Sequence, residues 1–118
     1  MNTERILIVE DNQDLADSLK QGFEEEAYTV SIANSAEHAF SELEQTDFDI
    51  LFMDVQLPGM DGINAMTNIL ESNPEIRVVI MSGYKIETLL AEAVNRGAVS
   101  MLQKPFAVEQ ALELIEES

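Results

Sequence analysis

The stretch ILFMDVQLPGMDG (residues 50–62) places a run of apolar residues directly before one carboxylate, Asp54, and then breaks into Pro and Gly. A short apolar run bounded by turn residues is typical of a strand that is buried on both faces. A carboxylate at the end of such a strand is costly to desolvate, so it is either a solvated loop residue or a functional group held by partners. The rest of the chain decides between these interpretations.

Four further apolar runs recur along the 118-residue chain at roughly even spacing. Together with the first they predict five strands, over residues 6–9, 28–33, 50–55, 76–81 and 98–102. The intervening segments carry apolar residues three or four positions apart, which predicts helices around residues 15–23, 36–43, 63–70, 86–94 and 108–115. Asp11-Asn12, Asn34-Ser35 and Asp61-Gly62 precede three of these helices, as expected of residues that begin a helix.

This strand and helix alternation predicts an α/β fold with three layers. The expected architecture is a (βα)5 doubly wound parallel sheet with right-handed crossovers and helices on both faces. A chain of 118 residues is long enough for one domain and too short for two ordinary ones, so residues 1–118 are expected to form a single domain.

The composition excludes several kinds of function. With 23 acidic and 6 basic residues the formal net charge is −17, which opposes direct binding to nucleic acid and favours divalent cations and basic protein surfaces. The chain has no Cys, hence no thiolate metal site or thiol nucleophile, and a reducing cytoplasmic setting is compatible with this. No apolar run approaches the length of a membrane span, so no membrane insertion is expected.

Polar side chains follow four of the predicted strands. In a parallel sheet every strand ends at the same edge, where ligands bind. Glu10 and Asp11 follow the first strand, Asp54 stands at the end of the third, Ser82 follows the fourth and Lys104 the fifth. Three carboxylates, one hydroxyl and one ammonium are therefore expected to converge from separate parts of the chain.

Such a cluster of carboxylates needs positive charge. Like charges about 4 Å apart repel by about 4 kcal/mol at an effective dielectric constant near 20. Lys104 supplies one positive charge, and Mg²⁺, which prefers oxygen ligands, would supply two more. An aspartate beside both cations is suited to attack phosphorus, because they neutralise the oxygens of the phosphoryl group during transfer. The site therefore indicates a phosphoryl acceptor.

The motifs at this edge closely resemble those of the receiver domains of two-component response regulators. They are ILIVED (residues 6–11), Asp54 with LPGMDG (57–62), MSG (81–83) and KPF (104–106), and the resemblance covers essentially the whole chain. It implies a flavodoxin-like fold of the chemotaxis-regulator type, with strand order 2-1-3-4-5.

The resemblance also implies a role for each residue of the acidic site. Asp54 would be the phosphorylated residue. Asp11 would bind Mg²⁺ directly, Glu10 would help directly or through water, and the carbonyl of Gln56 would complete the protein ligands. Lys104 would pair with the phosphoryl oxygens.

Further residues would act on switching and hydrolysis. Ser82 would hydrogen-bond a phosphoryl oxygen and move inward upon phosphorylation. Family members usually carry Tyr or Phe three positions before the lysine, where this chain has Met101, a flexible residue that can still fill the space vacated by Ser82. Gln56 and Tyr84 occupy positions that modulate hydrolysis in the family, and we expect Tyr84 to slow it by screening the attacking water. The bond before Pro105 would be cis, which only an X-Pro bond makes inexpensive.

The expected function is a phosphorylation-controlled switch. The phosphoryl donor would be a histidine kinase or a phosphotransfer protein, and the domain would catalyse its own phosphorylation and dephosphorylation, with no separate turnover substrate. The output would be altered affinity for an effector protein or domain, and a homodimer is compatible with the sequence. The alternative is a phosphorylation-independent, receiver-like binding module.

Two other classes fit the sequence less well. A haloacid-dehalogenase-type phosphatase also uses an aspartate nucleophile, but it needs a second Asp two residues later, where this chain has Gln56. A flavodoxin-like cofactor binder would need a phosphate-binding loop after the first strand, where Glu10 and Asp11 would repel the phosphate of FMN.

Overall fold

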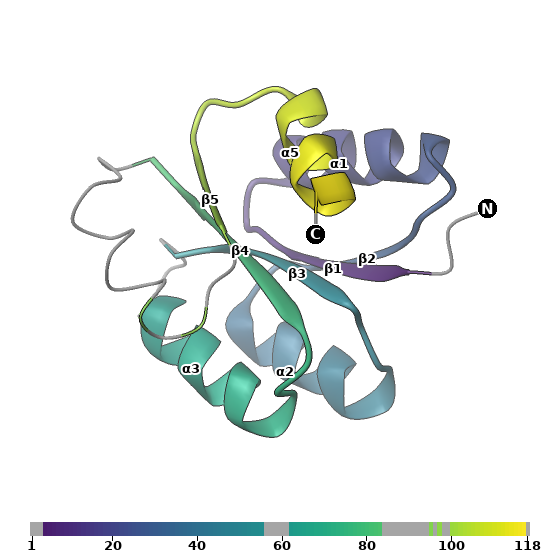
Figure 1. Cartoon of the computed structure of the whole chain (residues 1–118). Coiled ribbons are helices and arrows are strands. Elements are labelled where there is room, and N and C mark those ends of the chain that lie inside the picture. The colour runs from purple at the N-terminus through teal and green to yellow at the C-terminus, as the bar shows by residue number, and fades with distance from the viewer. Residues whose placement is uncertain (1–3, 56–61, 84–94, 96, 98–99, 118) are drawn as a thin grey trace.

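The computed structural model describes residues 4–55, 62–83, 95, 97 and 100–117. Its elements follow the predicted alternation (Figure 1). They are β1 (Arg5–Val9), α1 (Gln13–Glu25), β2 (Thr29–Ala33), α2 (Ala36–Gln45), β3 (Ile50–Asp54), α3 (Gly62–Ser72), β4 (Arg77–Ser82), β5 (Ser100–Gln103) and α5 (Val108–Glu117). The helix predicted around residues 86–94 lies outside the described residues. Every described helix is too short or too polar to cross a bilayer.

The five strands form one parallel sheet in the order β2-β1-β3-β4-β5, which confirms the predicted fold class and strand order. β1 lies in the interior of the sheet, where Ile6 is in register with Val30 on one side and with Ile50 on the other. Because all strands point the same way, their carboxyl ends meet at one edge, as the sequence predicted.

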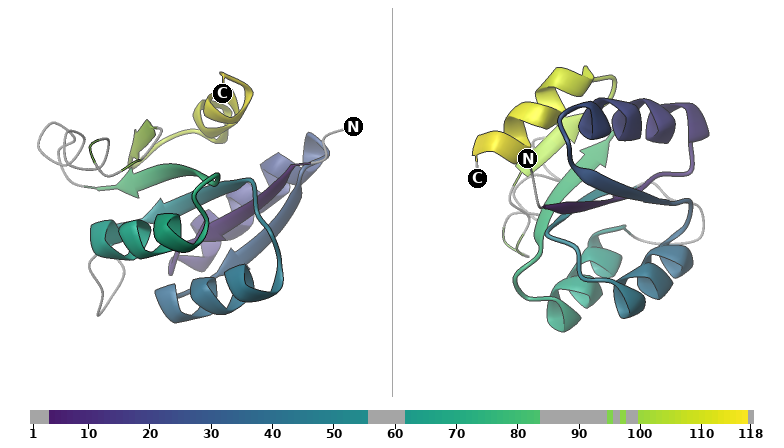
Figure 2. Two further views of the ribbon diagram at one scale, coloured as in Figure 1. Left: turned by 60° about the horizontal axis from the view of Figure 1, so that its bottom comes forward. Right: turned by 90° about the vertical axis from the view of Figure 1, so that its right-hand side faces the viewer.

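Helices cover both faces of the sheet, with α1 and α5 on one side and α2 and α3 on the other (Figures 1 and 2). Each face of the sheet has its own hydrophobic core, and successive residues of β1 alternate between them. Ile6 and Ile8 pack on the α1 and α5 side, and Leu7 and Val9 pack on the α2 and α3 side. All four are fully buried, and burial of each such side chain contributes about 1.5–3 kcal/mol. This is why these strands read as continuous apolar runs.

Side-chain caps fix where the first two helices begin. Asn12 precedes α1, and its Oδ1 accepts a hydrogen bond from the N–H of Leu15 at 3.2 Å. Ser35 precedes α2, and its Oγ accepts one from the N–H of His38 at 3.1 Å. Each cap satisfies a backbone donor that the helix itself leaves unpaired. The helix starts predicted at these residues are thereby confirmed.

The C-terminal end of α1 turns through a residue other than glycine. Ala27 has φ 68°, in the left-handed region. The N–H of Ala27 donates to Glu24 and that of Tyr28 to Phe23, at 3.0 and 3.2 Å, which is the bonding pattern of a Schellman motif. Phe23 and Tyr28 both pack in the core on the α1 and α5 side. The turn therefore delivers the chain directly into β2.

A close approach of two helices explains the glycine inside α1. A Cβ added at Gly22 would overlap the Cγ1 methyl of Val108, in the first turn of α5, and would lie 3.5 Å from its Cβ. Glycine in a helix interior costs about 1 kcal/mol relative to alanine. The cost is offset because α5, which follows Lys104 in sequence, can then pack directly against α1.

One predicted boundary was wrong in a way that matters for the site. Ser82 was expected to follow the fourth strand, but it is the last residue of β4, in register with Gln103 of β5. Pairing with β5 extends the ladder by one residue beyond the apolar run. Ser82 is consequently fully buried.

Candidate functional site

The first part of the site lies just beyond β1. The N–H of Glu10 donates to the carbonyl of Ala33 at 3.0 Å, so the backbone of Glu10 continues the contact between β1 and β2. The Glu10 side chain is buried, and its Oε2 accepts a hydrogen bond from the N–H of Asn12 at 3.1 Å. Asp11, between them, is exposed. Two neighbouring carboxylates therefore have different environments.

Asp54 ends β3 in the middle of the sheet and is only 3% exposed. It is in register with Met81 of β4, and the following N–H, of Val55, donates to the Met81 carbonyl at 3.1 Å. The backbone on both sides of Asp54 is thus held by the sheet. The carboxylate is presented at the edge of the sheet with little freedom to move.

Lys104 joins these carboxylates from the loop after β5. Its ammonium Nζ lies 2.6 Å from Oε1 of Glu10 and donates a hydrogen bond to Oδ2 of Asp54 at 2.9 Å. Its backbone N–H donates to the carbonyl of Ser82 at 2.7 Å, which brings the ends of β4 and β5 together. The Lys104–Pro105 peptide bond is cis, the geometry that the resemblance implies.

The charges of the site do not balance. Glu10, Asp11 and Asp54 carry three negative charges and Lys104 one positive charge, which leaves −2 when all are ionised. Burial raises the pKa of Glu10, and the contacts with Lys104 and with the N–H of Asn12 reverse only part of that effect. Burial alone would lower the pKa of Lys104, but its close contacts with the negatively charged Glu10 and Asp54 outweigh burial and raise it. The ammonium therefore stays protonated, and the remaining net negative charge of the site can be neutralised by a bound cation.

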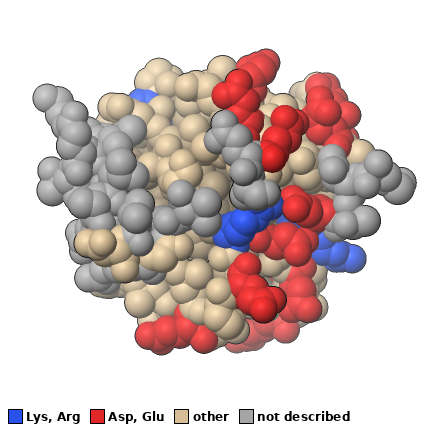
Figure 3. Space-filling view, in the orientation of Figure 1, with Lys and Arg blue, Asp and Glu red and all other residues tan. Residues whose placement is uncertain are grey.

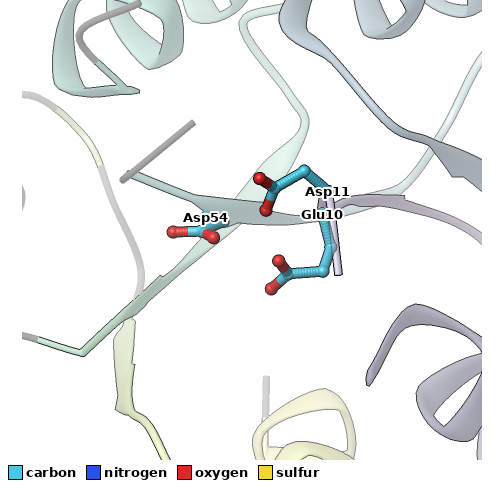
Figure 4. A group of neighbouring side chains, drawn as sticks. All are labelled: Glu10, Asp11 and Asp54. Carbon is cyan, nitrogen blue, oxygen red and sulfur yellow. The ribbon is translucent and has the colours of Figure 1, made fainter. Parts of the chain in front are cut away.

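The three carboxylates can hold a metal ion. Ligand oxygens of Glu10, Asp11 and Asp54 all lie within 4.8 Å of one another, and the side chains extend into a common space (Figure 4). An all-oxygen donor set with excess negative charge fits a hard divalent cation. Gln56, expected to complete the ligands, lies outside the described residues.

The remaining predicted residues fall in different places. Ser82 lies beside the site through its backbone contact with Lys104. Met101 lies on β5, in register with Ile80, and is half-buried against the core on the α2 and α3 side. Tyr84 lies outside the described residues.

Sequence reasoning missed one residue of the site, Asn12. The sequence identified it as the start of a helix, but its N–H also donates a hydrogen bond to the Glu10 carboxylate.

Acidic side chains also predominate beyond the site. Figure 3 shows Asp and Glu side chains gathered on one side of the face drawn, several of them next to the basic side chains near its centre.

Comparison with known proteins identifies the family. The family model described as the response regulator receiver domain matches residues 6–116. The chain is 33% identical to the nitrogen assimilation regulatory protein NtrX of Azorhizobium caulinodans over 94% of its own length, but it spans only 25% of that protein. It is 29% identical to sporulation initiation phosphotransferase F of Bacillus subtilis, over 98% of this chain and 93% of the relative.

The structural comparison agrees. The structure of a CheY-like response regulator receiver domain protein from Methanospirillum hungatei superposes with a TM-score of 0.92 and 31% sequence identity, covering 98% of this chain and 93% of the other. The family match covers nearly all of the chain, and the observed strand order is that of the predicted fold. The chain therefore belongs to the response regulator receiver domain family and is a receiver domain of the two-component type.

Proposed function

We propose that residues 1–118 act as a single phosphoacceptor domain in which Asp54 receives the phosphoryl group. The observation that carries this proposal is the contact of one ammonium, Lys104, with two buried carboxylates, Glu10 and Asp54, at the edge of the sheet. Asp54 combines a fixed position with a hydrogen bond from a positively charged donor. These are the requirements for a nucleophile that must meet a phosphoryl group in line.

The proposed step is a direct displacement at phosphorus. A carboxylate oxygen of Asp54 attacks the phosphorus of a phosphohistidine, an O–P bond forms, and the P–N bond breaks with its electron pair returning to the imidazole. Lys104, 2.9 Å from Oδ2 of Asp54, is placed to neutralise charge on the phosphoryl oxygens. Hydrolysis of the acyl phosphate by water regenerates Asp54 and releases inorganic phosphate.

Magnesium is the proposed cation. Asp11, Asp54 and Glu10 would hold it, with the Gln56 carbonyl as a further ligand, and it would neutralise the phosphoryl oxygens during transfer. The exposed position of Asp11 supports a role as the ligand reached from solvent. The buried pair of Glu10 and Asp54 supplies negative charge behind it.

The proposed switch depends on Ser82 and Met101, and the phosphoryl lifetime on Gln56 and Tyr84. Ser82 would bind a phosphoryl oxygen, and the burial of its side chain at the end of β4, beside Lys104, supports this. Met101 would adjust its packing when Ser82 moves. Tyr84 would screen water from the acyl phosphate and slow its hydrolysis.

The proposed partners follow from the relatives. The donor would be a histidine kinase or a phosphotransfer protein in the cytoplasm, and the readout an effector protein or domain, with a homodimer as one form of output. One relative of similar length is named a phosphotransferase, which supports phosphoryl transfer as the activity. The chain spans about a quarter of regulatory proteins such as NtrX and DctD. The much greater length of these relatives supports an effector domain or protein as the partner that reads the phosphorylated state.

The test is the intact mass of the protein after incubation with acetyl phosphate and Mg²⁺. The proposal expects a gain of one phosphoryl group that disappears in Asp54→Asn and when the metal is chelated. Asp49→Asn, an exposed carboxylate that also flanks β3, is the matched control and should retain the gain. Absence of an adduct in the wild type, with acetyl phosphate and with phosphorylated donor proteins, would leave the phosphorylation-independent binding module as the better interpretation.

A further inference from the structure

We propose that Glu10 is a positioning residue, which holds the Lys104 ammonium against Asp54 before any phosphoryl group arrives. Asp11 would be the main ligand of the cation, whereas Glu10 would act chiefly by positioning Lys104. The inference rests on the proposed function, because it assigns a separate task to one carboxylate of the same site.

The contacts of Lys104 favour Glu10 as its anchor. Its Nζ is 2.6 Å from Oε1 of Glu10 and 2.9 Å from Oδ2 of Asp54, and the Glu10 side chain is 0% exposed. Within the described part of the chain, Oε1 of Glu10 receives no well-directed hydrogen bond. The charge of Lys104 is therefore what compensates this buried oxygen, so carboxylate and ammonium fix each other.

Glu10 is itself held on its other side. Its Oε2 accepts the N–H of Asn12 at 3.1 Å, and its own N–H donates to Ala33 at 3.0 Å. A free lysine side chain loses up to about 2 kcal/mol of rotamer entropy when it becomes ordered. Because Glu10 orders Lys104 in the resting protein, that loss does not have to occur during transfer.

Asp11 provides the contrast within the same segment. It belongs to the group of three carboxylates, but it is exposed and is not among the partners of Lys104 in the described residues. Changing either residue to its amide removes one negative charge from the site. Only the change at Glu10 should release Lys104. Glu10→Asp keeps the charge but retracts the carboxylate by about 1.5 Å, the length of one C–C bond.

The first test detects the Lys104 ammonium directly, in protein free of metal and phosphoryl donor. The chain has three lysines, Lys20, Lys85 and Lys104, so ¹⁵N-lysine NMR signals can be assigned by Lys→Arg substitution. A paired, half-buried ammonium should exchange its protons slowly and give a visible signal. We expect this signal in the wild type and in Asp11→Asn, its loss in Glu10→Gln, and a shifted or broadened signal in Glu10→Asp.

The second test separates rate from metal requirement. Acetyl phosphate labelling is followed over a series of Mg²⁺ concentrations. Glu10→Gln should lower the rate at saturating Mg²⁺ by about 10- to 100-fold, the effect expected of losing one charged contact. Asp11→Asn should chiefly raise the Mg²⁺ concentration needed for half the maximal rate.

Two results would overturn the inference. One is a Lys104 signal that is unchanged in Glu10→Gln, and the other is a Glu10→Gln protein that reaches the wild-type rate once Mg²⁺ is raised. Circular dichroism checks that each variant folds. If Glu10→Gln does not fold, both tests are made with Glu10→Asp instead. Failure of the wild type to be phosphorylated would refute the proposed function alone, since the NMR test needs no transfer.

Discussion

Replacement of Lys104 by methionine tests whether the buried carboxylates depend on its charge. The substitution keeps much of the length and apolar character of the side chain but removes the ammonium that contacts Glu10 and Asp54. Removing one partner of a buried ion pair typically costs about 3–5 kcal/mol, because the other charge is left uncompensated. Without metal, the Lys104→Met protein should therefore be clearly less stable than the wild type at neutral pH.

Protonation of Glu10 limits this loss and makes it depend on pH. The ordinary pKa of Glu10 is 4.5, and burial raises it in the folded protein. Protonating a glutamate of ordinary pKa, as in the unfolded chain, costs about 3.4 kcal/mol at pH 7 and about 0.7 kcal/mol at pH 5, and this cost is the most that an uncompensated Glu10 charge can take from the folded state. Since the folded-state pKa lies above the unfolded value, stability is lost as pH rises above 4.5. Loss of Lys104 should raise that pKa further, so the stability difference from the wild type should grow between pH 5 and pH 7.

Urea unfolding followed by circular dichroism in EDTA measures this difference. We expect Lys104→Met to be destabilised by about 3 kcal/mol at pH 7 and by less than half of that at pH 5. Lys20→Met removes the same charge from α1 and should show no such pH dependence. An equal loss at both pH values would mean that Lys104 acts through packing, and the electrostatic reasoning would be refuted.

Three further predictions concern the packing of α1 and β2. Gly22→Ala should destabilise the protein by about 1–2 kcal/mol, because overlap with Val108 outweighs the gain in helix propensity, and Val108→Ala should relieve the loss in the double variant. Thermal unfolding checks this, and Ser18→Ala, on the exposed surface one turn earlier, should not destabilise. Ala27→Gly should stabilise by about 0.5–1 kcal/mol in urea unfolding by relieving the left-handed backbone, whereas an unchanged midpoint would show no strain there. Burial, helped by nearby Glu4, raises the pKa of the Tyr28 phenol above 10.0, so stability should fall above about pH 10, and Tyr28→Phe should weaken that fall in alkaline unfolding experiments.

The fold and the location of the site could be predicted because both follow from periodic features of the sequence. The apolar runs located the strands, and caps such as Asn12 and Ser35 located helix starts. Parallel strands end at one edge, so Glu10, Asp54 and Lys104 had to converge. No knowledge of side-chain contacts was needed for these steps.

The remaining features depend on contacts between distant segments. The sequence places three carboxylates near Lys104. Only the geometry of two loops determines that its ammonium contacts Glu10 and Asp54. Gly22 reads as a weak helix residue until α5 is seen to approach it, and Ala27 carries no sequence signal for a left-handed turn. Ser82 was misplaced by one boundary because its strand pairing comes from β5, not from its own polarity.

Asn12 has a mechanical consequence beyond its two hydrogen bonds. Its side chain closes the first turn of α1, while its N–H holds the carboxylate of Glu10. We therefore expect a ligand that displaces this turn to displace the Glu10 carboxylate as well, and a cation that attracts Glu10 to change the free energy needed to move the turn. Thermodynamic reciprocity makes these two effects equal in free energy. We therefore expect the start of α1 and the phosphoryl site to be coupled through Asn12, which is hydrogen-bonded to both.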